Sequence, residues 1–151
     1  MAALVLAAVG LGGCGGDDDR LSKADLISKG DALCAATTEK LEPVFGKLFP
    51  TGSETPPADK AAGPMRTAAT ELREEYRDFS ALEPPAKDEK RFAAILEGFD
   101  AAVTDVEDAA ERAEAGDTEG YLKKLEAANA KDAESRELMK AYGFEECAGS
   151  E

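Results

Sequence analysis

The stretch FAAILEGFDAAVTDVEDAAERAEAG, residues 92–116, decides the fold of this chain. Its apolar residues recur at alternating spacings of three and four, the pattern of a helix that buries one face. They are Phe92, Leu96, Phe99, Val103, Val106, Ala110 and Ala113. Gly116 suits the left-handed conformation that commonly ends a helix. The stretch therefore predicts an amphipathic helix packed in a bundle.

An acidic stripe runs along the same helix, one position after the last six of those apolar residues. It consists of Glu97, Asp100, Thr104, Glu107, Glu111 and Glu114. One interpretation is a docking face for a basic partner protein or for divalent cations. The other is pairing with basic residues of neighbouring helices, such as Arg73 and Arg77 or Lys123 and Lys124. Pairing is the preferred interpretation, because flanking charges commonly select helix partners.

Three further segments show helical periodicity. The first begins at Ser22, where Asp25 three residues later completes a capping-box-like pair. We expect a kink or break in it near Glu42, because Pro43 lacks an amide hydrogen and crowds the preceding turn. In the second segment Pro64 is tolerable only in the first helical turn, and Pro84 begins a new element.

The last segment runs from Asp117, a good N-cap, to Gly143, a good helix stop. Short connections between four helices predict an all-α fold, an up-down-up-down four-helix bundle over residues 22–147. The last four residues, 148–151, form a tail. The middle of the fourth helix, 126–137, has only alanines as apolar residues. Such small residues either let helices approach closely or leave a groove for an apolar ligand, and close packing is preferred because interiors rarely keep voids.

Composition narrows the range of functions. The chain has 32 acidic and 18 basic residues, a formal net charge of −14, which argues against nucleic acid as a partner. It has no His, so the usual general base and the commonest metal ligand are missing. No Lys sits at an obviously buried position, where it could activate a Ser or Thr nucleophile in place of His. We therefore expect a protein that is not an enzyme and has no metal site and no cofactor.

The first 14 residues have the features of a targeting signal. The apolar run from Ala2 to Leu11, followed by Gly12-Gly13-Cys14, resembles the lipobox of bacterial lipoproteins. The run is too short to span a bilayer, which needs about 20 residues, but has the length of a signal-peptide apolar region. No Lys or Arg precedes it, so we expect translation to start upstream. The alternative, an apolar arm on a cytosolic protein, would be an aggregation liability.

The lipobox resemblance implies a domain order and a location. Residues 1–13 would be a signal peptide, and Cys14 would carry a diacylglyceryl group that anchors the chain to the cell membrane on its extracytoplasmic face. Residues 14–21, with three consecutive Asp, would form a flexible acidic linker. Lipidation of Cys14 leaves Cys34 and Cys147 as the one possible pair, and an oxidising compartment permits their disulfide. That bond requires the end of the last helix to fold back by roughly 18 Å towards Cys34.

A second resemblance covers most of the chain. The lipobox, the early helical cysteine, Pro84-Pro85 and the ending Tyr142-Gly-Phe…Cys147 are similar to small helical envelope lipoproteins of high-GC Gram-positive bacteria. This implies location and architecture only. We expect a protein-interaction or scaffolding role, with a basic envelope protein as partner, or alternatively a carrier of a small apolar ligand. A pocket lined by Leu and Phe near residues 127–133 would favour the carrier, and a filled core with an exposed patch the interaction protein.

Overall fold

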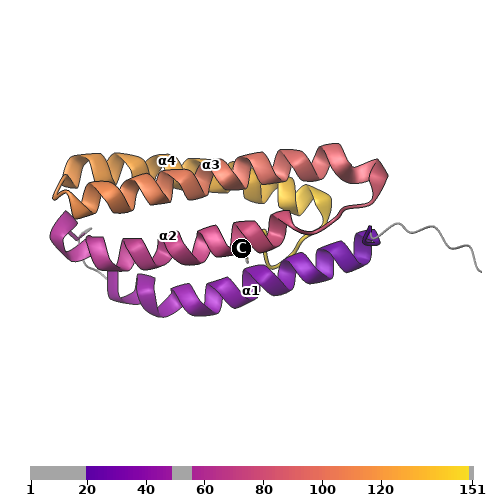
Figure 1. Cartoon of the computed structure of the whole chain (residues 1–151), viewed down its shortest axis with the longest axis horizontal. Helices are drawn as coiled ribbons and strands as arrows, with labels where there is room; N and C mark the ends of the chain where they lie inside the picture. The colour runs from indigo at the N-terminus through magenta and orange to yellow at the C-terminus, as the bar shows by residue number, and fades with distance from the viewer. Residues whose placement is uncertain (1–19, 49–55, 150–151) are drawn as a thin grey trace, which may run out of the picture.

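The computed structural model describes residues 20–48 and 56–149 and shows the expected all-α bundle (Figure 1). Its elements are α1 (Lys23–Leu48), α2 (Ala58–Ser80), the short 3-10 helix η1 (Ala86–Asp88), α3 (Glu89–Glu114) and α4 (Thr118–Tyr142). Successive long helices run in opposite directions, so the up-down-up-down prediction is confirmed. In the described residues, no helix is both long enough and apolar enough to cross a bilayer.

The helix ends follow local sequence signals. The Ser22 hydroxyl accepts a hydrogen bond from the Asp25 backbone N–H at 3.1 Å and donates one to the Asp25 carboxylate at 2.6 Å. Asp117 caps α4 by accepting from the Gly120 N–H at 2.9 Å. Gly116 and Gly143 have φ values of +74° and +118°, where residues with a Cβ are strained. These four predicted boundaries are confirmed.

The break expected near Glu42 does not occur, and Pro64 does not lie in a first helical turn. Helix α1 continues through Pro43 to Leu48 without a break, and Leu41 and Leu48 on either side of the proline are both buried. Helix α2 begins at Ala58, so Pro64 lies inside the helix and not in its first turn. Ala58 and Ala61 are buried before it. Burial of these apolar faces outweighs the hydrogen bond that each proline loses.

The helices pack in sequence order. Helix α1 packs on α2, α2 on α3 and α3 on α4, whereas α1 and α4 make no extended contact. One apolar cluster is rich in aromatic rings and joins α2, α3 and the segment after α4, with Phe79 near Phe92 and Phe144. A second, rich in alanine, fills the opposite end of the bundle. The bundle is therefore closed on three helix–helix interfaces and open on the fourth.

The segment after α4 folds back onto α1 and closes one end of the open interface. The Asp31 carboxylate accepts hydrogen bonds from the backbone N–H groups of Glu145, Glu146 and Cys147 at 3.0–3.2 Å. The predicted Cys34–Cys147 disulfide is present, with Cα atoms 5.1 Å apart. The turn at Gly143 and the contacts with Asp31 bring the segment after α4 back along α1, so that Cys147 reaches Cys34.

Candidate ligand groove between the first and last helices

A cavity of about 680 Å³ lies along the open interface between α1 and α4. Apolar side chains from all four helices supply most of its lining, and they include Leu41, Phe45, Met65, Leu72, Phe99, Val103, Val106, Leu125, Ala128 and Met139. Polar residues on α1 and α4 border it, namely Thr37, Thr38, Glu42, Asn129, Asp132 and Arg136. The Cys34–Cys147 disulfide and Gly149 lie at its closed end. We call this space the groove.

The alanine-rich middle of α4 has both of the roles that sequence analysis left open, on different faces. Towards α3 it packs closely, because a Cβ at Gly98 would lie only 3.3 Å from the Ser135 Cβ. Towards α1, Ala128 and Asn129 line the groove with short side chains. The same helix is fixed to α3 by Lys124, whose ammonium lies 3.0 Å from the buried Asp105 carboxylate. A close α3–α4 contact thus leaves the α1 side of α4 free to form a groove wall.

Glu75 is the unusual residue of the groove. It lies on α2, lines the cavity and is only 8 % exposed. Burial among apolar side chains raises the pKa of its carboxyl to about 7. A hydrogen bond from Thr37 stabilises the charged form and lowers the pKa, but its effect is smaller than that of burial. Asp132 on α4 raises this pKa further and Arg136 lowers it. No ion pair in the described part of the chain involves Glu75.

Glu75 is not among the site residues predicted from the sequence, although its spacing indicates a buried position. It follows Leu72 by three residues and precedes Phe79 by four, so helical spacing places it on the buried face of α2. A carboxylate at a core position is rarely tolerated without a partner. Thr37, at a buried position of α1, is the matching signal on the facing helix.

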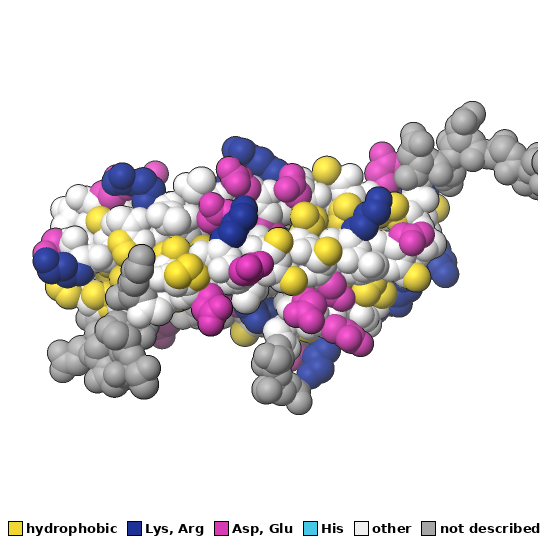
Figure 2. Space-filling model, turned by 90° about the horizontal axis from the view of Figure 1, so that it is seen from below, with side chains coloured by type: hydrophobic (Ala, Val, Ile, Leu, Met, Phe, Trp, Pro, Cys, Tyr) yellow, Lys and Arg dark blue, Asp and Glu magenta, His cyan; other side chains and the backbone are white. Residues whose placement is uncertain are grey.

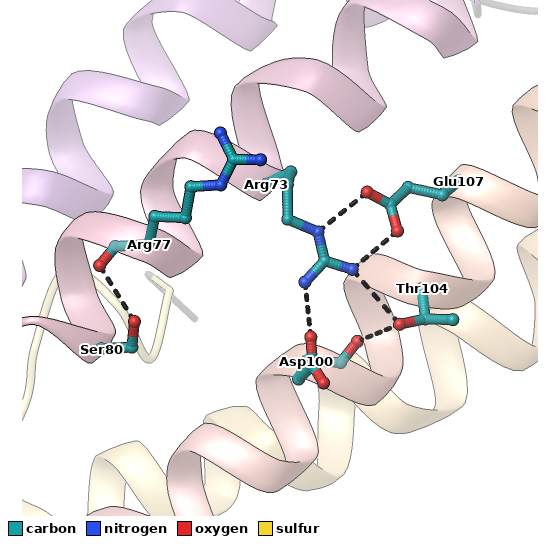
Figure 3. A network of polar contacts seen from close by, with 6 residues as sticks. All are labelled: Arg73, Arg77, Ser80, Asp100, Thr104 and Glu107. Atoms are coloured by element: carbon teal, nitrogen blue, oxygen red, sulfur yellow. Dashed lines mark hydrogen bonds and ion pairs between the residues drawn. The ribbon is translucent and has the colours of Figure 1, made fainter.

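The acidic stripe faces α2 and is largely paired within the molecule (Figure 3). The Arg73 guanidinium on α2 lies 2.5 Å from the Asp100 carboxylate and 2.6 Å from that of Glu107, and it also donates to Thr104. These contacts, led by the hydrogen bond to Glu107, raise the pKa of Arg73 above its usual range. The pairing interpretation therefore holds for the middle of the stripe.

The remaining stripe residues differ in their contacts. Glu114 pairs with Arg66 on α2, with 2.5 Å between the charged atoms. Glu97 and Glu111 are exposed, and no ion pair of the described residues includes them. Arg77 and Lys123 form no described ion pair with the stripe, while Lys124 pairs with Asp108 and Asp105. Two of the five predicted docking carboxylates thus remain available to a partner.

Cys14, the predicted lipidation site, lies outside the described residues. Comparison with known proteins finds no matching family model, no similar curated protein and no similar solved structure.

Proposed function

We propose that this chain is a lipid-anchored, extracytoplasmic protein that binds a small molecule with an apolar body in the groove between α1 and α4. The observation that carries the proposal is the groove itself. Its volume of about 680 Å³ falls within the range of small-molecule sites, about 300–1,000 Å³. Its lining combines apolar side chains with eight polar or charged ones. Small-molecule sites likewise combine an apolar lining with polar groups that fix the ligand's orientation.

The groove favours a carrier of a small molecule over a protein-interaction role, because the sequence predicts a pocket lined by Leu and Phe near residues 127–133 for a carrier. Leu125, Phe45 and Phe99 line the cavity next to residues of the 127–133 segment. A filled core would have supported scaffolding instead. The acidic stripe offers less to a partner, because Arg73 and Arg66 already occupy three of its carboxylates.

The anchor is supported by the lipobox-like Leu11-Gly12-Gly13-Cys14 and by the disulfide, since such bonds persist outside the cytoplasm. We expect Cys14→Ser to abolish incorporation of a fatty-acid analogue and to release the chain from membranes. Metabolic labelling followed by fractionation tests this expectation. Equal labelling of mutant and wild type would refute lipidation at Cys14.

Ligand binding is tested with Nile red, a neutral apolar dye whose fluorescence rises in apolar sites. Asn129→Trp places a large side chain at the groove wall, and Ala130→Trp places it on the next residue, which is exposed and does not line the groove. We expect saturable dye binding that the Asn129 variant weakens at least about tenfold, the loss produced by about 1.4 kcal/mol. The Ala130 variant should bind like wild type. Equal binding by both variants would place the dye elsewhere and refute the proposal.

A further inference from the structure

The groove has a strongly unequal charge lining. Four carboxylates border it, those of Glu42, Glu75, Asp132 and Glu146, against one cationic side chain, Arg136. Arg136 is already engaged, because its Nε lies 2.6 Å from the Asp132 carboxylate one helical turn away. The remaining acids have no cation of their own in the lining.

One of the four carboxylates differs from the rest by its depth. Glu42 and Glu146 are exposed at the border, whereas Glu75 lies among the apolar side chains of the groove. Helix α3 presents only apolar residues to this space, namely Phe99, Ala102, Val103 and Val106. A buried carboxylate without a cationic partner is destabilising in the charged form. A ligand cation placed beside it would remove that penalty.

We propose that the groove selects organic cations, molecules with an apolar body and a protonated amine, and that the amine lies against the Glu75 carboxylate. The inference rests on the proposed function and specifies the ligand class for the same groove. The apolar body lies along Leu41, Phe99 and Leu125, and the ammonium donates to Glu75. The Thr37 hydroxyl hydrogen-bonds to Glu75 and holds the carboxylate in place.

The surroundings of the groove reinforce this selection. An anionic ligand would meet Glu42, Asp132 and Glu146 at the border, and only Arg136 would attract it. Figure 2 shows acidic, basic and hydrophobic side chains interspersed over the face viewed from below. With a net charge of −14 the whole molecule attracts cations and repels anions over distances of about 10 Å at moderate salt.

A proton competes with the ligand amine for Glu75. The groups that face this carboxyl are Thr37 on α1 and Asp132 and Arg136 on α4, with no charged side chain of α3 in the groove lining. Because burial brings the pKa of Glu75 to about 7, the carboxyl is mostly neutral at pH 6 and mostly charged at pH 8. We therefore expect amine affinity to rise about tenfold between these two values, since the charged fraction rises by that factor.

The experiment uses the full-length chain with Cys14→Ser and three probes with the same body, n-octylamine, n-octanol and n-octanoate. Displacement of Nile red and calorimetry measure their affinities. At pH 8 we expect octylamine to bind at least about tenfold more tightly than octanol, because a hydrogen bond between two charged groups is stronger than one from a neutral hydroxyl. Octanoate should bind most weakly.

Glu75→Gln and Glu74→Gln are the matched variants, because each replaces one carboxylate of α2 at constant side-chain volume, and Glu74 is exposed and does not line the groove. Only the first should abolish the preference for octylamine and its pH dependence. Wild-type chain that binds all three probes equally, or an unchanged preference in Glu75→Gln, would overturn the cation inference and leave the binding function intact. Failure of every probe and of Nile red to bind would overturn both.

Discussion

Glu75→Gln should make the protein more stable at neutral and alkaline pH. The substitution replaces a buried carboxyl by a neutral amide of the same size, so it removes the charge and leaves the shape of the groove. Burial raises the folded-state pKa of Glu75 to about 7 from an ordinary value of 4.5, against the Thr37 hydrogen bond. The folded protein therefore holds a proton that the unfolded chain releases over this interval.

The size of the effect follows from proton linkage. Stability associated with this raised pKa is fully present below pH 4.5 and is lost as the pH rises through 7. A difference of 2.5 in pKa, the interval from 4.5 to 7, corresponds to about 3 kcal/mol at about 1.4 kcal/mol per pKa unit. This is a large share of a typical domain stability of about 5–15 kcal/mol. The Gln variant should recover most of it at pH 8 and almost none at pH 4.

Urea unfolding of the Cys14→Ser chain, followed by far-UV circular dichroism at pH 4, 6 and 8, measures this difference. The oxidised chain is used throughout, and Glu42→Gln serves as the exposed control. We expect the gain from Glu75→Gln to increase steadily with pH, while Glu42→Gln gives no such trend. A gain that does not change with pH, or a loss at pH 8, would show that Glu75 is not held neutral by burial.

Three further predictions concern the packing of the bundle. Gly30→Ala should destabilise the bundle by about 1–2 kcal/mol, because the new Cβ would lie 2.5 Å from the Phe144 ring. This overpacking outweighs the gain in helix propensity. Thermal or urea unfolding measures the loss, and an unchanged midpoint would contradict the prediction. Breaking the disulfide with Cys34→Ala and Cys147→Ala should lower stability by up to about 5 kcal/mol, from the entropy of a loop with a sequence separation of 113 residues, while helicity persists at low temperature. Arg73→Gln should cost only about 1 kcal/mol, and less in high salt, because its acidic partners are partly exposed; a salt-independent loss would argue against an ionic contribution.

The fold was predictable because its signals are local or periodic. The seam beginning at Phe92, the caps at Ser22 and Asp117 and the stop at Gly143 each act within one or two turns, so the sequence alone displays them. The prediction for Pro64 failed because burial of Ala58 and Ala61, within two turns before the proline, compensates the local defect.

The groove was harder to predict, because it depends on how far apart two helices lie. The small residues near Ala128 were compatible with close packing and with a cavity, and the structure contains both. The spacing of Glu75 in the sequence predicts its position on the buried face of α2. Its lack of a basic partner depends on the tertiary structure and cannot be predicted from spacing. The sequence predicts Arg73 as one possible partner of the acidic stripe. Close packing of α2 on α3 brings its guanidinium into contact with Asp100.

The disulfide also determines what happens when the backbone is cut. Cys34 and Cys147 enclose α2, α3, α4 and half of α1 in one covalent ring. A single cleavage at any peptide bond inside that ring leaves both fragments joined through sulfur. A nicked chain therefore migrates as one species on a non-reducing gel and separates only after reduction. If the chain is anchored as proposed, a single cut in a loop would leave all four helices attached to the membrane.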